Sequence, residues 1–230
     1  MIAKFSMQKY FLFLFVVSLS SNLKAESPDF KSQLFKTGTL VYSDDFDQDY
    51  SKERWGAPKK DREIKDGKLI FVPLFNNAEE AQKALGRDHH LGLGVVAHLN
   101  KIPEKFVCHM RFKFEAEAIQ PARPVLQIGH HMILLTYLEE GGHRIKLPGG
   151  PSFTETKSNM KLNEWVDLII EYQKGKILIG VNGFSRIYEH KNVTIDNKMD
   201  KLGPRFSFKH SEGPKNRLVF DHVRLWEIKE

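Results

Sequence analysis

The sequence is short of the features that hold many small proteins together or mark their chemistry. Its 230 residues contain one cysteine, Cys108, so no internal disulfide can form and hydrophobic burial has to stabilise the fold. It contains no GxGxxG, no Walker loop and no Arg or Lys run longer than a dipeptide, which argues against nucleotide and nucleic-acid binding. No apolar run reaches the ~20 residues of a membrane-spanning helix. With 41% hydrophobic and 28% charged residues, the composition is that of an ordinary globular protein.

The N-terminus has the pattern of an export signal. A positively charged segment precedes the apolar run Tyr10–Leu19, and Leu23 and Ala25 suit the −3 and −1 positions of a cleavage site. We therefore predict a signal peptide over residues 1–25 and a secreted or periplasmic protein without stable membrane insertion after cleavage. A retained membrane anchor is the alternative. Cleavage would remove three lysines and no acid, which lowers the formal net charge from +6 to +3, too little to indicate a nucleic-acid partner.

An alternating pattern over Phe106–Glu115 predicts a β-strand. Every second residue is apolar, and most of the intervening residues are polar. Successive side chains of a strand point to opposite faces, so one face of this strand is buried and the other faces water or a ligand. Similar segments follow at 164–172, 176–181 and 184–190, and an Asn-Gly dipeptide that suits a two-residue hairpin turn joins the last two.

The rest of the chain also predicts strands and little helix. Further strand candidates are Leu40–Ser43, Lys68–Val72, Gly92–Leu99, Val125–Ile128, Met132–Leu138, Arg205–Lys209 and Leu218–Ile228. One helix is expected over Asn77–Leu85, capped by Asn76 or Asn77. About a dozen short strands without crossover helices predict an all-β fold, two antiparallel sheets packed as a jelly-roll sandwich. We expect this domain to span residues 39–230, with 26–38 as a linker or N-terminal extension.

Three segments resemble a known family. They are Tyr42–Phe71, with Y-S-D-D-F-D and I-K-D-G-K-L-I-F; Leu162–Gly183, L-N-E-W-V-D-L-I-I-E-Y-Q-K-G-K-I-L-I-G-V-N-G; and Leu202–Ile228, with L-G-P-R-F-S-F-K-H and R-L-V-F-D-H-V-R-L-W-E-I. Together they are similar to the concanavalin A-like jelly rolls, most closely to the 3-keto-disaccharide hydrolase domain family (DUF1080), often described as glycoside hydrolase 16-like. The resemblance implies a secreted β-sandwich that acts on carbohydrate. Residues 118–129 differ from the Asn-Ser-Gly element typical of that family, so we transfer no catalytic residue from it.

The carboxylates do not follow the pattern of a retaining glycosidase. Asp167 and Glu171 lie three and seven residues after Glu164, so on a regular strand both point to the face opposite Glu164. Retention of configuration needs two carboxyl groups about 5–5.5 Å apart on one face. This spacing therefore does not provide a catalytic set.

Histidines are the stronger candidates for acid–base chemistry. His89-His90 and His130-His131 are adjacent pairs, and His109 lies on the polar face of the alternating strand. If each pair lies within a strand, one ring of each pair can converge with His109 into an acid/base or metal site. Unrelated surface histidines are the alternative. The candidate catalytic residues are His109, His130 and Glu115.

Planar and aromatic side chains that suit a sugar lie on the same strand and on neighbouring segments. The candidate substrate-binding residues are Arg111, Gln127, Tyr137, Glu139, His143 and Arg144. For the charged residues of the alternating strand, a solvated ladder of cross-strand ion pairs is the alternative.

Aspartates near both ends of the expected domain suggest a metal site. If the first and last strands pair, Asp221 approaches Asp44 or Asp45, and these carboxylates with backbone carbonyls could hold a structural Ca²⁺. Aspartates that form turns in water are the alternative. No other cofactor is expected.

The sequence therefore predicts a monomeric, exported β-sandwich whose partner is carbohydrate. As an enzyme, it would cleave a glycosidic bond in a 3-keto sugar, the substrate that the resemblance implies. The keto group acidifies the neighbouring C–H, so a single histidine or glutamate base could start an elimination. The alternative is a non-catalytic glycan-binding or adhesion module of the bacterial envelope.

Overall fold

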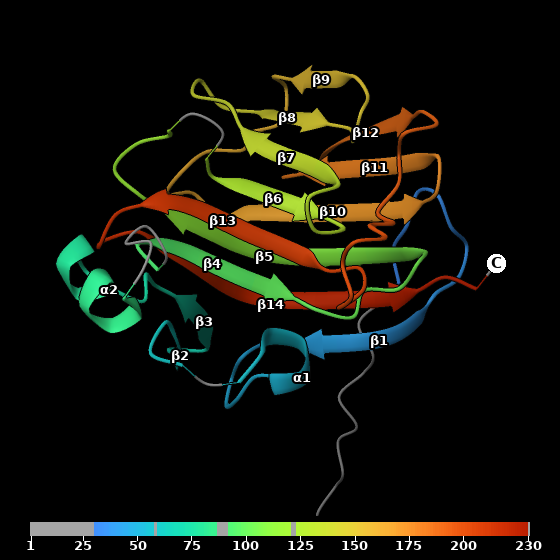
Figure 1. Cartoon of the computed structure of the whole chain (residues 1–230). Helices are drawn as coiled ribbons and strands as arrows, with labels where there is room; N and C mark the ends of the chain where they lie inside the picture. Colours follow the sequence, from blue (N-terminus) through green and yellow to red (C-terminus); the bar gives the residue numbers. More distant parts are fainter. Residues whose placement is uncertain (1–29, 58, 87–91, 121–122, 230) are drawn as a thin grey trace, which may run out of the picture.

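The structure, a computed structural model, describes residues 30–57, 59–86, 92–120 and 123–229. Its strands form two antiparallel sheets that lie in two layers (Figure 1). The prediction of an all-β sandwich is confirmed. The predicted signal peptide at 1–25 and the pair His89-His90 lie outside the described residues. Within the described ranges, no helix is long and apolar enough to cross a membrane.

One layer is an eight-stranded sheet with the order β12-β11-β10-β5-β14-β3-β2, to which β1 adds by pairing with β14. Its strands are β1 (Thr39–Asp44), β2 (Arg62–Lys65), β3 (Lys68–Phe71), β5 (Phe106–Glu115), β10 (Val166–Gln173), β11 (Lys176–Val181), β12 (Phe184–Glu189) and β14 (Arg217–Glu227). The alternating strand predicted at 106–115 is β5, between β10 and β14 near the middle of this sheet.

The other layer is a six-stranded sheet with the order β4-β13-β6-β7-β8-β9. Its strands are β4 (Gly94–Leu99), β6 (Val125–Ile128), β7 (Ile133–Tyr137), β8 (His143–Lys146), β9 (Ser152–Glu155) and β13 (Phe206–Glu212). Strand β13 lies between β4 and β6 although it is far from both in the sequence. The sheet therefore brings together side chains from three separate parts of the chain.

Two helices lie outside the sheets. The predicted helix is α2 (Ala78–Leu85), where the Asn77 side chain accepts a hydrogen bond from the Glu80 N–H and Gly86 ends the helix in a left-handed conformation. The other, α1 (Lys52–Trp55), was not predicted. Its four residues are too few to show a helical period in the sequence.

The space between the sheets is filled by aromatic and aliphatic side chains from alternate strand positions. Phe208 of β13 illustrates the packing, since its ring lies 4.9 Å from that of Phe220 on β14 and 5.5 Å from that of Phe112 on β5. All three side chains are fully buried. The apolar core thus joins the two sheets and separates their outer faces.

Residues 30–38, part of the predicted linker or N-terminal extension, contact the outer face of the eight-stranded sheet. Glu171 of β10 is buried there and accepts hydrogen bonds from Ser32 Oγ at 2.5 Å and from the backbone N–H groups of Gln33 and Leu34 at 2.8 and 2.7 Å. Phe30 also packs edge-on against Trp226, with ring centroids 5.8 Å apart. A single carboxylate thus anchors this segment.

Candidate functional site

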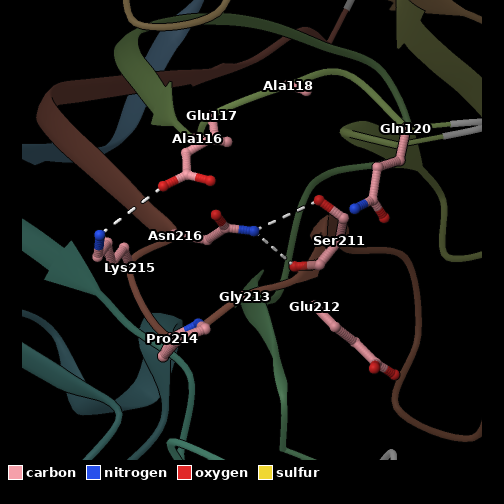
Figure 2. Close-up of a pocket in the computed structure, with 10 residues that line it drawn as sticks. All are labelled: Ala116, Glu117, Ala118, Gln120, Ser211, Glu212, Gly213, Pro214, Lys215 and Asn216. Carbon is pink, nitrogen blue, oxygen red and sulfur yellow. Dashed lines mark hydrogen bonds and ion pairs between the residues drawn. The ribbon is translucent and has the colours of Figure 1, made fainter.

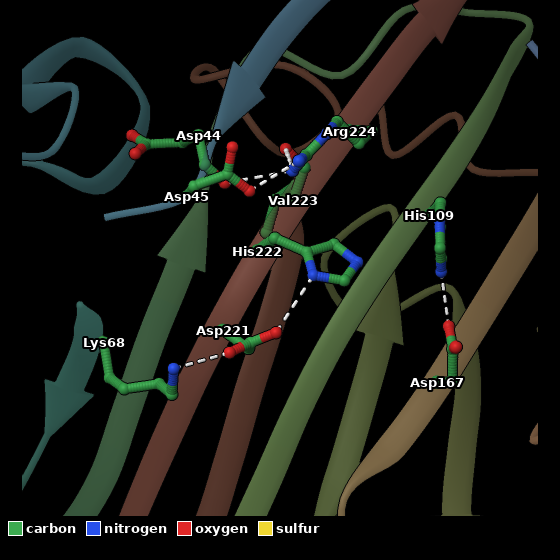
Figure 3. A network of polar contacts seen from close by, with 9 residues as sticks. All are labelled: Asp44, Asp45, Lys68, His109, Asp167, Asp221, His222, Val223 and Arg224. Carbon is green, nitrogen blue, oxygen red and sulfur yellow. Dashed lines mark hydrogen bonds and ion pairs between the residues drawn. The ribbon is translucent and has the colours of Figure 1, made fainter. Parts of the chain in front are cut away.

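Three of the predicted site residues, His109, Arg111 and Glu115, lie on the outer face of the eight-stranded sheet. They alternate along β5 with residues that are buried in the core. The His109 side chain is hydrogen-bonded to Asp167 of β10, and its ring lies 5.0 Å from that of His222 on β14 (Figure 3). The hydrogen bond to His109 lowers the pKa of the Asp167 carboxyl.

Other charged side chains of this face also have partners. Lys113 Nζ lies 2.6 Å from Glu115 Oε1, and Lys68 Nζ lies 2.6 Å from Asp221 Oδ1. The guanidinium of Arg111 stacks over Trp165 at 5.4 Å from the ring centroid. The face therefore carries one ion pair within β5, one between β3 and β14, and one cation stacked on an aromatic ring.

The three aspartates of the predicted Ca²⁺ site have protein partners. Strands β1 and β14 pair as expected, but Asp45 binds Arg224 and Asp221 binds Lys68 and His222. Asp44 accepts hydrogen bonds within its own strand and turn. In the described part of the chain, no group of three His, Cys, Asp or Glu side chains is arranged to hold a metal ion.

His143, a predicted substrate-binding residue, lies inside the sandwich. It is fully buried, with Nδ1 2.7 Å from Ser158 Oγ and Nε2 3.3 Å from the Tyr188 hydroxyl. Burial lowers its pKa to about 4. His143 alternates with Arg144 along β8, so the strand that exposes the arginine directs the histidine inward. The prediction that His143 contacts a saccharide is corrected.

The outer face of the six-stranded sheet collects side chains from β4, β13 and β6. The strand register places Ser207 of β13 opposite His98 of β4 on one side and opposite Gln127 of β6 on the other. The neighbouring residues Phe206 and Phe208 point into the core, so Ser207 points outward. A histidine, a serine and a glutamine thus form one row across three strands.

A turn after β6 adds His130 to this row. Ser207 Oγ lies 3.0 Å from Nδ1 of His130 and 3.0 Å from Nδ1 of His98. His130 and His131 have positive φ angles of 31° and 72°, and the Gln127 side chain accepts a hydrogen bond from the His131 N–H. Both histidines therefore lie in the turn, with rings 4.1 Å apart, and the expectation that the pair lies within a strand was wrong. We call His98, His130 and Ser207 the imidazole cluster.

The hydrogen bonds of the imidazole cluster define how its protons are shared. A serine hydroxyl donates only one hydrogen bond, so Ser207 donates to Nδ1 of one imidazole and accepts from the protonated Nδ1 of the other. The ring that donates through Nδ1 has, as a neutral tautomer, an unprotonated Nε2. The cluster therefore provides one Nε2 lone pair that can take a proton.

Both imidazoles are neutral at pH 7. Burial, followed by the charge of Arg205, lowers the pKa of His98 to about 4 and that of His130 to about 4. Arg205 is itself held in a buried ion pair with Asp200, at 3.0 Å. A neutral imidazole beside a fixed cation can accept a proton but does not carry one at neutral pH.

Two hollows open on the same face. One, of about 490 Å³, has Arg123, Lys209 and Ser211 in its lining. The other, of about 500 Å³, lies over β7 and β8 and has the predicted residues Glu139 and Arg144 in its lining. The predicted residue Tyr137 also borders it, but its ring is buried in the core, 5.8 Å from that of Phe114. Gln120 lines both hollows. Together they give the six-stranded face room for a ligand that extends across several strands.

A third hollow, of about 300 Å³, lies where the loop after β5 meets the loop after β13 (Figure 2). Asn216 closes its wall by donating hydrogen bonds to the backbone oxygen and hydroxyl of Ser211. Lys215 Nζ lies 3.8 Å from Glu117 Oε1, and both side chains are exposed. The one lysine in its lining is already paired with Glu117, so this hollow is the weaker candidate.

Two neighbouring rows of residues cross the outer face of the six-stranded sheet. The row of the imidazole cluster continues through Leu134, Lys146 and Ser152, and the next row runs Val96, Lys209, Val125, Thr136, Arg144 and Thr154. Neither row contains Asp or Glu. Both retaining and inverting glycosidases generally use two carboxyl groups, so these rows do not support either mechanism.

The predicted site residues are thus divided between two faces. His130, Gln127, Glu139 and Arg144 lie on the six-stranded side, whereas His109, Arg111 and Glu115 lie on the eight-stranded side. The core separates the faces, so the predicted catalytic set of His109, His130 and Glu115 cannot act on one substrate. His98, Ser207 and Lys209 were not predicted. The sequence shows that these residues alternate with apolar residues. It does not show that β13 pairs with β4 and β6, which brings these residues close to His130.

The fold is similar to that of solved β-glucanases. A non-specific endo-β-1,3(4)-glucanase from family GH16 has a TM-score of 0.55 and 11% identity, covering 83% of this chain and 91% of that chain. The β-glucanase of Bacillus licheniformis has a TM-score of 0.54 and 8% identity, covering 84% and 100%. The catalytic domain of an endo-1,3-β-glucanase (laminarinase) from Thermotoga petrophila has a TM-score of 0.54 and 13% identity, covering 85% and 100%.

These similarities confirm the concanavalin A-like jelly-roll fold. No protein-family model matches the chain, and no curated protein matches it. The likeness to the 3-keto-disaccharide hydrolase family therefore stays a prediction. At identities near 10%, the solved structures support the architecture, and the chemistry has to be argued from the residues of this chain.

Proposed function

We propose that the protein is an exported, carbohydrate-active enzyme whose substrate lies across the outer face of the six-stranded sheet. The observation that carries this proposal is the imidazole cluster, in which two neutral histidines share the Ser207 hydroxyl. The adjacent row of the sheet contains Val96 and Lys209, which line the first hollow. The β-glucanases with the same fold support a saccharide as the substrate class. Export rests on the N-terminal pattern of the sequence.

The chemistry that fits this face is base-initiated elimination. In a 3-keto-glycoside, the keto group acidifies the C2–H, and the unprotonated imidazole Nε2 takes this proton. The C1–O bond to the leaving sugar breaks as the C1=C2 double bond forms, and the leaving oxygen takes a proton from water. Addition of water across C1=C2 completes the cleavage. This route needs one base and no pair of carboxylates.

Three matched variants test the proposal. H98N and H130N keep an amide at the Nδ1 position to hydrogen-bond Ser207 but remove Nε2, and H109N makes the same change on the opposite face. The assay follows release of nitrophenol from a nitrophenyl 3-keto-glucoside, with deuterium incorporation at C2 in heavy water as a second measurement. We expect one or both cluster variants to lose about 100-fold in rate, the usual contribution of a general base, and H109N to retain the wild-type rate.

Two results would contradict the proposal. Loss of activity in H109N with full activity in both cluster variants would place the chemistry on the eight-stranded face. Turnover without deuterium incorporation, unchanged in all three variants, would exclude an imidazole base.

The absence of paired carboxylates from the six-stranded rows favours a second candidate, a non-catalytic glycan-binding module. This candidate predicts saturable binding of oligosaccharides to the wild-type protein, with no product from glycosides or 3-keto-glycosides. Binding calorimetry and product analysis on the same sample distinguish the two.

A further inference from the structure

The two outer faces differ in how their positive charges are neutralised. On the eight-stranded face, Lys68, Lys113 and Arg224 each bind a carboxylate. On the six-stranded face, four cations form no ion pair with any residue in the described part of the chain. We call them the unpaired cations; they are Arg123, Lys209, Arg144 and Lys146.

The unpaired cations line the two hollows. Arg123 and Lys209 line the first hollow, whose lining contains one glutamate, Glu212. Arg144 and Lys146 line the second hollow, whose lining contains Glu139. Lys209 on β13 and Arg144 on β8 lie in the same row of the sheet, three strands apart. At about 4.8 Å per strand, their backbones are separated by about 14 Å. The positive charge therefore extends along the face.

Lys209 connects this charge to the imidazole cluster. Burial and the nearby charges of Arg123 and Arg205 lower the pKa of its ammonium group, and Lys209 in turn contributes to the lowered pKa values of His98, His130 and His131. Arg205 has Asp200 as its partner, whereas a half-buried ammonium beside the guanidinium of Arg123 is electrostatically unfavourable unless an anion accompanies it. Lys209 follows Ser207 by two positions on β13, so a ligand anion seated there lies on the same face as the imidazole cluster.

We infer that the saccharide bound by this face is anionic, with a uronate carboxylate or a sulfate ester seated against Arg123 and Lys209. The inference rests on the proposed function and names its substrate class. Arginine and lysine bind carboxylate and sulfate through charge-assisted hydrogen bonds, and Arg144 and Lys146 can take a second anionic group further along the chain of sugars.

A uronate also supplies the acidic C–H that the imidazole needs. With its carboxylate neutralised by Arg123 and Lys209, the C5–H becomes more acidic and its proton passes to the unprotonated Nε2. The C4=C5 double bond forms as the C4–O4 bond breaks, and the leaving oxygen takes a proton from water. The hydroxide left behind takes the proton from the imidazolium, which regenerates the water and the base. The products are an unsaturated uronate and a shortened saccharide, with no net consumption of water.

The test is calorimetric binding of three oligosaccharides to the full protein: a neutral glucan oligomer, a uronate oligomer and a sulfated oligomer. The variants are K209Q and R123Q, with K113Q as a control that removes one positive charge from the opposite face. We expect an anionic oligomer to bind more tightly than the neutral one. K209Q and R123Q should each weaken binding of the anionic oligomer about tenfold, whereas K113Q should leave its affinity unchanged. Added salt should weaken the anionic oligomer only.

The outcomes separate this inference from the proposed function. Equal binding of neutral and anionic oligomers, unaffected by K209Q and R123Q, would overturn the anionic substrate and leave a saccharide-binding face intact. Failure of all three oligomers to bind would overturn both. The elimination is supported if the protein prefers the uronate oligomer over the sulfated one and forms an unsaturated product that is lost in H130N or H98N. Anionic binding alone is supported if the protein prefers the sulfated oligomer and forms no product.

Discussion

Ser207 Oγ on β13 lies 3.0 Å from Nδ1 of His130, in the turn after β6, although the two residues are 77 positions apart in the sequence. The pairing of β13 with β6 creates this contact by placing Ser207 beside the end of β6. Ser207 is fully buried, so it fixes the orientation of the imidazole without reaching a ligand. We therefore regard Ser207 as a positioning residue.

Replacing Ser207 should reduce catalysis through the histidines. In S207A, both Nδ1 atoms lose their partner, so the rings can rotate and kcat should fall about tenfold with little change in KM. The loss of a buried hydrogen-bond partner should also lower the free energy of unfolding by about 1–3 kcal/mol. Kinetics and urea unfolding measure the two effects.

The matched control is S158A, which removes the 2.7 Å contact with His143 inside the sandwich. It should cause a similar loss of stability and leave kcat unchanged. Equal kcat values for S207A and the wild type would show that Ser207 has only a structural role.

The activity should persist at mildly acidic pH. A general base must be unprotonated, and the pKa values of His98 and His130 are both lowered to about 4. At about pH 5, where an ordinary histidine of pKa about 6.5 is mostly protonated, the cluster still holds a free lone pair. We expect kcat/KM to decline only as the pH falls towards about 4, and a decline centred near pH 6.5 would contradict the assignment of the base to this cluster.

The same pKa values predict how stability depends on pH. Between the unfolded value of about 6.5 and the folded value of about 4, the unfolded state binds more protons than the native state, so stability rises with pH in this window. The contribution is complete above about pH 6.5 and is lost as the pH falls through 4. Urea unfolding of the wild type and H98N across this range should show a smaller slope for the variant.

Sequence alternation was sufficient to predict the sandwich and most of its strands, whereas the four-residue strands β2, β8 and β9 were not predicted. The pattern of Phe106–Glu115 identified β5 with its boundaries, and the Asn182-Gly183 dipeptide, with φ angles of 49° and 86°, forms the predicted turn between β11 and β12. Local residue chemistry determines these features, because side-chain direction in a strand and the φ angles of a two-residue turn depend on neighbouring residues only.

The site could not be predicted in the same way, because it depends on which strands share a sheet. Strands β5 and β6 are consecutive in sequence but belong to different sheets. His109 on β5 and His130 in the turn after β6 therefore lie on opposite outer faces. His98 shows the reverse case: its outward direction follows from the buried residues beside it, and only the β4–β13 pairing brings it to Ser207.

Phe208 should be a major contributor to the cohesion of the two sheets. Its fully buried ring contacts Phe112 and Phe220 of the opposite sheet. F208A should lower the free energy of unfolding by about 3–5 kcal/mol, the usual cost of removing a buried phenyl ring. The exposed Val96 on neighbouring β4 provides the control, since V96A should change stability by less than about 0.5 kcal/mol. Similar values for the two variants in urea unfolding would contradict the described packing.

Glu171 should hold residues 30–38 against the eight-stranded sheet. Its carboxylate accepts hydrogen bonds from Ser32 Oγ, the Gln33 N–H and the Leu34 N–H. In E171A, these donors lose a charged partner that is worth about 1.5–3 kcal/mol for a single bond, so the segment should become accessible to proteases while the sandwich stays folded. Limited proteolysis with mass spectrometry locates the cleavage, and E189A, which removes an exposed carboxylate of β12 paired with Lys176, should remain resistant. Resistance of E171A would mean that the aromatic contacts of Phe30 and Phe35 with the cluster around Trp226 are sufficient to hold the segment.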